Sequence, residues 1–152
     1  MNELLEKIKM AIEPILRKNE AFLVDLSYSK IKNAKKFVFF VDKDTYVTHE
    51  DCMKISKDLE FFLAQQGLVS ENDQIEISSP GVDRPLKFLR QFSKHKERHF
   101  SVTFKVDDEK IETREMILKD VIDDLLIFDE NGRIREIKFL DIIKARTLLK
   151  FK

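Results

Sequence analysis

Residues 77–87 read Ile-Ser-Ser-Pro-Gly-Val-Asp-Arg-Pro-Leu-Lys, and this stretch decides how the chain is organised. Pro80 fixes its own φ and keeps Ser79 extended, and Gly81 follows in the order that suits a type II turn. The second proline of the stretch holds the preceding arginine extended. The pattern predicts a stiff, bent loop that joins two domains and presents hydroxyl, carboxylate and guanidinium groups.

The same stretch resembles the signature of a known family, the bacterial ribosome maturation factor RimP. In that family a strand runs into Ser-Ser-Pro-Gly-hydrophobic-Asp-Arg-Pro-Leu, and Val82 occupies the hydrophobic position here. Residues 47–52, Val-Thr-His-Glu-Asp-Cys, are also similar, since the family has a cysteine in a similar helix opening. The resemblance extends over nearly the whole chain.

Length and composition are those of one or two small, well-charged domains. The chain has 152 residues, of which 43% are hydrophobic and 37% charged, and its 28 Lys and Arg balance its 28 Asp and Glu. One cysteine excludes a disulfide framework and a cysteine-based zinc site. No apolar run approaches the roughly 20 residues of a membrane span, and the start of the chain lacks the layout of a signal peptide. We therefore expect a cytoplasmic protein.

The first domain, residues 1–85, is predicted to have the order helix, strand, strand, helix, strand. Apolar residues recur at helical spacing in two segments and alternate with polar ones, or form a short β-rich run, in three others. One sheet with both helices on one face would bury the apolar stripes. The predicted helices lie near 4–16 and 48–67, and the strands over 22–28, 37–41 and 74–78.

Local signals predict how these helices begin and end. Pro14 removes a backbone donor, so we expect a kink or a late restart in the first helix. Asn19 is expected to stop that helix in a left-handed conformation. Thr48 with Asp51 is a near capping box for the second helix, and Gly67 suits its end.

The second domain, residues 86–152, is predicted to be rich in strands. Residues 86–99 form a short helix or turn with apolar residues facing inward, and Asn131-Gly132 is the strongest hairpin signal in the chain. Strands are expected over 100–106, 111–118, 124–128, 134–139 and 142–149. Five short strands suggest a small barrel, and the resemblance to RimP implies an SH3-like barrel here. The predicted fold is thus α+β, an α-β-β-α-β domain followed by a small SH3-like β-barrel.

Charge is distributed unevenly along the chain. Residues 1–85 carry 12 Lys and Arg against 15 acids, and residues 86–152 carry 16 against 13. Two stretches are basic, 84–98 and 133–152. Strand alternation should place Arg133 and Arg135 on one face, which would form a positive platform for an RNA backbone. The alternative is an ordinary solvated strand face.

Candidate binding residues come from the loop and the two basic stretches. Lysines and arginines would neutralise phosphates, and Arg84 would be a bidentate donor. Asp83 either contacts a partner or holds the loop. The residues predicted to bind RNA or a ribosomal protein are Ser78, Ser79, Pro80, Gly81, Asp83, Arg84, Lys87, Arg90, Lys94, Arg133 and Arg135.

Catalytic and metal sites are not indicated. The sequence has no phosphate-binding or dinucleotide-binding glycine pattern. The acids Asp42, Asp44, Glu50 and Asp51 lack the spacing of a calcium loop and suit a solvated turn, and His95 with His99 has no third ligand. Cys52 lies on an apolar helix face near His49, which favours a core role over that of a nucleophile. A hydrolase using Ser79 remains a rival and would need a histidine within reach.

The resemblance to RimP implies a non-enzymatic assembly factor that binds the immature small (30S) ribosomal subunit and promotes its maturation. The implied partners are 16S rRNA and a small-subunit ribosomal protein near the decoding region. We expect no cofactor, no metal and no membrane association, and a monomer. The alternative is a stand-alone RNA-binding regulator built on an Sm- or SH3-like barrel.

Overall fold

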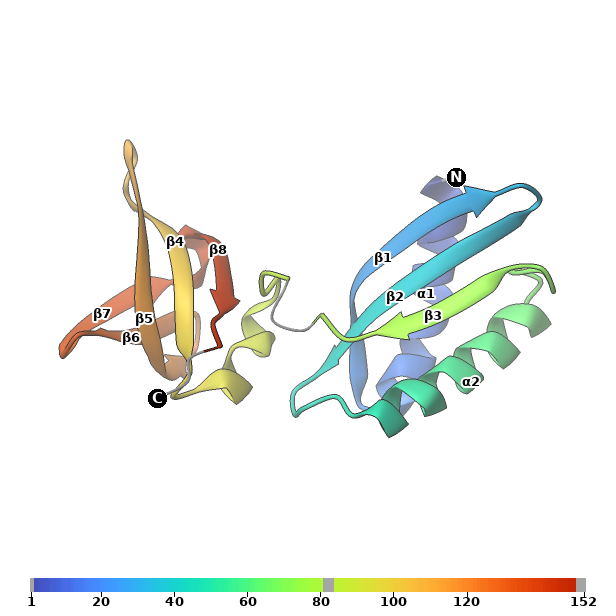
Figure 1. Cartoon of the computed structure of the whole chain (residues 1–152), viewed down its shortest axis with the longest axis horizontal. Coiled ribbons are helices and arrows are strands. Elements are labelled where there is room, and N and C mark those ends of the chain that lie inside the picture. The colour runs from blue at the N-terminus through green and yellow to red at the C-terminus, as the bar shows by residue number, and fades with distance from the viewer. Residues whose placement is uncertain (1, 81–83, 150–152) are drawn as a thin grey trace. The chain divides into compact units, whose positions relative to one another are not determined.

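The computed structural model describes residues 2–80 and 84–149, which form two compact units (Figure 1). The first unit is Met1–Ser79 and the second unit is Pro80–Lys152, whereas the sequence pattern predicts the boundary at the far end of the same loop, after Pro85. In chain order the elements are α1 (Asn2–Lys18), β1 (Ala21–Ile31), β2 (Ala34–Lys43), α2 (His49–Gln65), β3 (Gln74–Ser78), the 3-10 helices η1 (Leu89–Gln91) and η2 (Ser93–His95), β4 (His99–Asp107), β5 (Lys110–Ile122), β6 (Leu125–Glu130), β7 (Arg133–Lys138), the 3-10 helix η3 (Phe139–Asp141) and β8 (Ile142–Thr147).

The first unit has the predicted order of helices and strands, on a three-stranded sheet. The strands lie in the order β1-β2-β3, with β1 and β2 antiparallel and β2 and β3 parallel. The parallel pairing requires a crossover between β2 and β3, and α2 supplies it. As a result β3, which leads into the Pro/Gly loop, forms one edge of the sheet (Figure 1).

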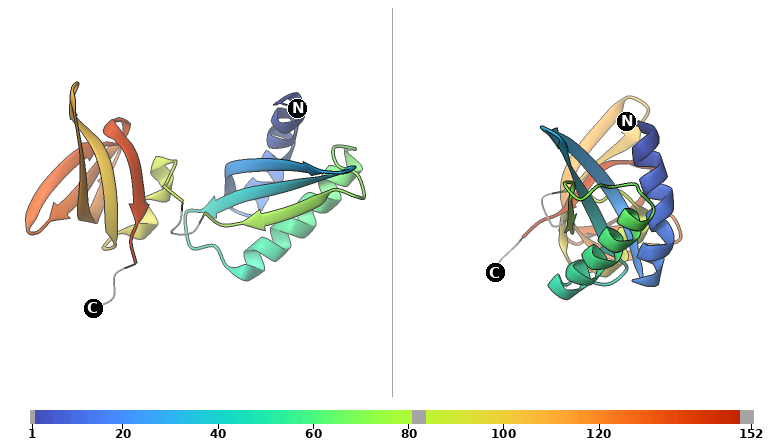
Figure 2. Two further views of the ribbon diagram at one scale, coloured as in Figure 1. Left: turned by 45° about the horizontal axis from the view of Figure 1, so that its top comes forward. Right: turned by 90° about the vertical axis from the view of Figure 1, so that its right-hand side faces the viewer.

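Both helices pack on the same face of this sheet, as predicted (Figure 2, left). The face is set by alternation in β2, where Phe37, Phe39 and Val41 are fully buried. Three residues from each helix join them in one core: Ile8, Ile12 and Leu16 from α1, and Ile55, Leu59 and Leu63 from α2. Burying these side chains is the main stabilisation of the unit, at roughly 1.5–3 kcal/mol for each large apolar residue.

The end of α1 differs from its sequence-based prediction. The helix runs through Pro14 to Lys18, so the late restart does not occur. Pro14 is exposed, and the Met10 carbonyl that loses its partner is on a residue that is also exposed, so water can hydrate it. The left-handed residue is Glu20, with φ of 58°, and not Asn19. The side-chain amide of Asn19 instead donates to the Ile15 carbonyl at 2.9 Å.

The start and end of α2 follow the predicted signals. The Asp51 N–H donates to the Thr48 hydroxyl at 3.1 Å, and the Thr48 N–H donates to the Asp51 carboxylate at 2.9 Å, which completes a capping box. Gly67, just beyond the helix, has φ of 69°, where a side chain would be strained.

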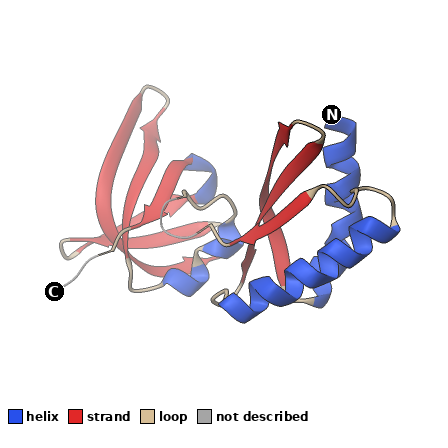
Figure 3. Ribbon diagram, turned by 45° about the vertical axis from the view of Figure 1, so that its right-hand side comes forward, coloured by secondary structure: helices blue, strands red, loops and turns tan. Residues whose placement is uncertain are grey.

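The second unit is a five-stranded antiparallel sheet in the order β7-β6-β5-β4-β8. Figure 3 shows that strands make up most of this unit. All five predicted strands are present. Strand β5 extends well beyond its predicted end because a bulge between Leu118 and Asp120 lets it continue to Ile122, and β8 ends earlier, at Thr147. The edge strands β7 and β8 are joined through η3 and are not paired with each other, so the sheet is open and the predicted barrel closure is not confirmed.

The core of the second unit is built on aromatic residues. Phe92 and Phe100 stack with ring centroids 5.7 Å apart, and Phe128 meets Phe100 edge to face at 5.9 Å. Phe92 comes from the connecting segment, which the sequence predicts as a short helix or turn and which forms η1 and η2. The inward-facing apolar residues of that segment, as predicted, attach it to the sheet of the second unit.

Candidate nucleic-acid interface

The Pro/Gly loop begins where β3 ends. Ser78 is the last residue of β3, and its hydroxyl donates to the Ser79 carbonyl at 3.2 Å. The Ser79 side chain is exposed and Pro80 follows it. Gly81 and Asp83, which the sequence predicts as binding residues, lie outside the described residues, and so does Val82.

Beyond the loop, backbone hydrogen bonds attach the chain to the second unit. The Leu86 N–H donates to the Ala145 carbonyl of β8 at 2.7 Å. The N–H groups of Lys87 and Phe88 both donate to Oε1 of Gln91, each at 2.8 Å, and Gln91 is fully buried. A buried amide in this position closes the turn as a backbone carbonyl would. The backbone of Lys87 is therefore fixed relative to the sheet, and its Nζ lies 5.6 Å from the Phe88 ring centroid.

The two 3-10 helices present the next predicted cations. Arg90 is in η1 and exposed, and Lys94 is in η2 and half-buried. Phe92 lies between them in sequence and is buried in the core. Together with Arg84 and Lys87, these residues bring four of the predicted binding side chains onto one short segment of the second unit.

Strand β7 carries Arg133 and Arg135 on one face, as the sequence pattern predicts, but part of that face is buried. Ile134 is the solvent-facing residue, 57% exposed, whereas Arg135 shares its face with buried Ile137. Arg135 Nε lies 3.0 Å from a carboxylate oxygen of Glu130, and its guanidinium lies 5.7 Å from the Phe104 ring centroid. The face that carries the arginines is therefore the one that turns toward the edge of the core.

Arg133 and Arg135 consequently differ in their surroundings. Arg133 is exposed at the start of β7, whereas the charge of Arg135 is matched by Glu130. Other cations of the second unit are also paired with acids. Lys96 Nζ lies 3.0 Å from Asp120, and Lys119 Nζ lies 2.8 Å from Glu97. The sequence count of basic residues therefore overstates how much positive charge this surface offers to an anionic partner.

Residues 2–80 and 84–149 hold no group of three or more His, Cys, Asp or Glu that could bind a metal ion. The acids of residues 42–51 have local roles. Asp42 accepts the N–H of Lys43 at 2.8 Å, and Asp51 closes the capping box. The backbone hydrogen bond from Thr48 is the main reason that the pKa of Asp51 lies below its ordinary value.

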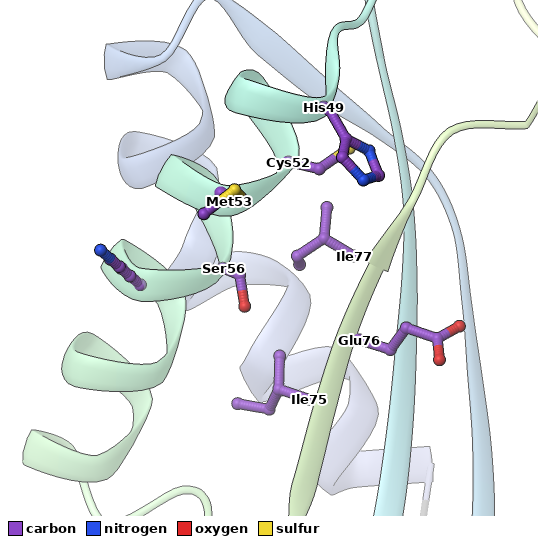
Figure 4. A pocket seen from close by; sticks show the side chains of 8 residues that line it. His49, Cys52, Met53, Ser56, Ile75, Glu76 and Ile77 are labelled. Carbon is purple, nitrogen blue, oxygen red and sulfur yellow. The ribbon is translucent and has the colours of Figure 1, made fainter.

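A groove between α2 and β3 is the feature that sequence reasoning missed (Figure 4). It is lined by His49, Cys52, Met53, Ser56, Lys57, Ile75, Glu76 and Ile77. Cys52 is partly buried, and burial, with a contribution from the charge of Asp51, raises the pKa of its thiol. A raised pKa disfavours the thiolate that a cysteine nucleophile needs. No local sequence signal indicates this groove, because it forms only when α2 packs beside β3.

In the described part of the chain, no helix is long and apolar enough to cross a membrane. A comparison with protein-family models matches residues 11–83 to the RimP N-terminal domain. The matched segment contains β1, β2, α2 and β3 in full, the C-terminal part of α1 from Ala11 onward, and the first part of the Pro/Gly loop. Through this domain the chain belongs to the RimP family of ribosome maturation factors.

Proposed function

We propose that this protein binds the immature small (30S) ribosomal subunit and promotes its maturation. The observation that carries the proposal is the RimP N-terminal domain, whose match runs into the Pro/Gly loop. The loop is followed by a segment that is hydrogen-bonded to the second unit and carries Arg84, Lys87, Arg90 and Lys94. An RNA backbone is the partner that such a row of cations favours.

The mechanism uses positioning and not covalent chemistry. Lysine and arginine side chains contact phosphates and fix the orientation of the protein on 16S rRNA. Arg84 supplies a bidentate contact, and the exposed Ser79 supplies a hydroxyl. Tighter binding to an intermediate than to the finished subunit biases RNA folding and permits release. A small-subunit ribosomal protein near the decoding region is a second partner, and the protein acts in the cytoplasm as a monomer without a cofactor.

The second unit serves as an SH3-like module in this proposal. Its strand order, β7-β6-β5-β4-β8 with a 3-10 helix before the last strand, supports that assignment. Arg133 is the β7 residue that contacts RNA. Arg135 supports the module through Glu130 and Phe104 and makes no contact of its own.

Sedimentation of cell extract through a sucrose gradient, with immunoblotting for this protein, tests the proposal. The protein is expected with free small subunits and not with complete ribosomes. The variant Arg84→Ala/Lys87→Ala should fold normally and lose about tenfold or more in affinity for the small subunit. The matched control is Lys7→Ala/Lys18→Ala, which removes the same charge from exposed positions on α1.

Two results would contradict the proposal. If Arg84→Ala/Lys87→Ala and the control Lys7→Ala/Lys18→Ala co-sedimented equally with the small subunit, the loop segment would not be part of the interface. Tight binding to short free RNAs, with no preference for the small subunit, would favour a stand-alone RNA-binding regulator. A Ser79→Ala variant addresses the hydrolase rival, because a hydrolase would lose all of its activity in subunit maturation with the nucleophile, whereas a binding protein would lose at most one hydroxyl contact.

A further inference from the structure

In the described residues four strands lie at sheet edges, β1, β3, β7 and β8, and these edges differ in how they are protected. Strand β1 carries two charged side chains, Asp25 and Lys30. On the edge of β8, the Ala145 carbonyl accepts a hydrogen bond from the Leu86 N–H. The edge strand β7 carries four charged side chains in six residues, which is a usual guard against further pairing. Strand β3, by contrast, has one charged residue, Glu76, and is hydrogen-bonded to β2 alone among the described strands.

A groove of about 410 Å³ lies between β3 and α2. Ile75 and Ile77 point from β3 toward the helix, and Cys52 projects toward β3 from α2 (Figure 4). Met53 of α2 also lines the groove. Met53 is 59% exposed, although it is a large apolar residue. An apolar groove directly beside a free strand edge is the arrangement in which an extended peptide gains both backbone hydrogen bonds and side-chain burial.

The opposite face of β3 has a different character. Glu76 points away from α2 (Figure 4), and its side chain is 54% exposed even though its carboxylate lies 3.6 Å from Lys36 Nζ. A strand added beside β3 would place one residue next to Glu76, where a lysine or arginine forms a favourable cross-strand pair. The next residues on either side would face α2 and enter the apolar groove, because side chains alternate along a strand.

We propose that the β3 edge binds an extended segment of a basic protein in which apolar residues alternate with lysine or arginine. The apolar side chains enter the groove beside Met53, and the cations lie on the Glu76 face. Lys57 on the helix side of the groove opposes cations there, which fixes this orientation. The inference goes beyond the proposed function, because it concerns the first unit and does not depend on RNA binding by the second.

Charge favours a basic polypeptide over the other possible occupants. Residues 1–79 carry 11 Lys and Arg against 14 acids, so an RNA strand would bring one phosphate per nucleotide to a net acidic unit. A second copy of this chain, added antiparallel about the centre of β3, would place Glu76 opposite Glu76. Like charges directly opposite each other destabilise a strand pair.

Nuclear magnetic resonance on the ¹⁵N-labelled full chain tests the inference. The probe is the peptide acetyl-Lys-Val-Lys-Val-Lys-Val-amide. One control peptide has glutamate in place of lysine, and another has proline at the central valine, which removes a backbone donor. The lysine peptide should shift the amide signals of Gln74–Ser78 and of the first half of α2, and both control peptides should bind more weakly.

Two variants and one control, all at exposed positions, test which residues bind the peptide. Met53→Glu places a charge in the groove and should weaken binding of the lysine peptide about tenfold. Met10→Glu, at another exposed methionine on α1, is the matched control and should have no effect. Glu76→Lys should reverse the preference, so that the glutamate peptide binds better than the lysine peptide.

Several outcomes would overturn the inference. These are no binding of the lysine peptide to the wild-type chain, shifts confined to β7 or β8, binding of a short oligouridine at the same amides, and concentration-dependent dimerisation through β3. The Arg84→Ala/Lys87→Ala variant should keep full peptide binding. A failed prediction of peptide binding by the groove can therefore be distinguished from a failed prediction of RNA binding by residues 84–94.

Discussion

Gln91 holds Lys87 in place: Oε1 of the buried Gln91 side chain accepts the backbone N–H of Lys87 at 2.8 Å, and it accepts the N–H of Phe88 at the same distance. One side chain thus satisfies two donors at the start of the segment that we propose contacts RNA. Without Gln91, these two N–H groups next to the Pro/Gly loop would have only solvent as an acceptor. The consequence is that the geometry of this segment depends on a residue that carries no charge.

Replacement of Gln91 by leucine should therefore destabilise the second unit. Two partly buried N–H groups lose their acceptor, and each hydrogen bond contributes about 0.5–1.5 kcal/mol net, so we expect a loss of roughly 1–3 kcal/mol. Urea unfolding of the full chain, followed by circular dichroism, measures the change. Gln65→Leu, at an exposed position in α2, is the control and should change stability by less than about 0.5 kcal/mol. A stability equal to wild type in Gln91→Leu would show that water replaces the side chain.

The arginines of β7 should separate into a structural and a binding residue. Arg135→Ala removes a 3.0 Å contact to Glu130 and a cation–π contact to Phe104, and we expect a loss of about 1–2 kcal/mol in unfolding free energy. Arg133→Ala should leave stability within about 0.5 kcal/mol, because that side chain is exposed. Thermal unfolding of both variants makes the comparison, and similar melting temperatures would contradict the assignment.

The same two arginines show where sequence reasoning succeeds and where it fails. Strand periodicity correctly places Arg133 and Arg135 on one face with Ile134 on the other. Periodicity does not say which of the two faces is buried. In β7 Ile134 is exposed and Arg135 is half-buried, which is the reverse of what hydrophobicity alone suggests. The burial of Arg135 depends on its contacts with Glu130 and Phe104. Both residues belong to other strands, so only the tertiary structure reveals these contacts.

The first unit was more predictable, because its signals are local. The capping box at Thr48 and the helical stripes depend on residues close in sequence. Asn19 is the exception: its side-chain amide bonds to Ile15 and also to Asp58 of α2 at 3.1 Å, which no local pattern reveals. The groove beside β3 was missed for the same reason, since it exists only once α2 has packed.

Acid should weaken the start of α2. The Thr48 backbone N–H, chiefly, holds the pKa of Asp51 below its ordinary value of 3.8, against the smaller opposing effect of burial. The folded-state pKa is lower than the unfolded one, so this stabilisation is complete above about pH 4 and is lost as the pH falls through the folded-state pKa. Asp51→Asn should therefore reduce stability near neutral pH and flatten its decline in acid. Urea midpoints measured from about pH 2 to pH 6 test this, with Glu60→Gln on the same helix as the control.

The β6–β7 hairpin supplies a test of the strongest turn signal in the chain. Asn131 and Gly132 have φ of 53° and 90°, as a type I′ turn requires, and the Gly132 N–H donates to the Asp129 carboxylate at 2.7 Å. No atom lies within 4 Å of a methyl group added at Gly132, so Gly132→Ala should cost only the conformational strain, about 1–2 kcal/mol. Asn131→Gly keeps the turn accessible and should change stability by less than about 1 kcal/mol. Calorimetric unfolding of the two variants measures both values, and a neutral Gly132→Ala would mean that the hairpin adopts another turn.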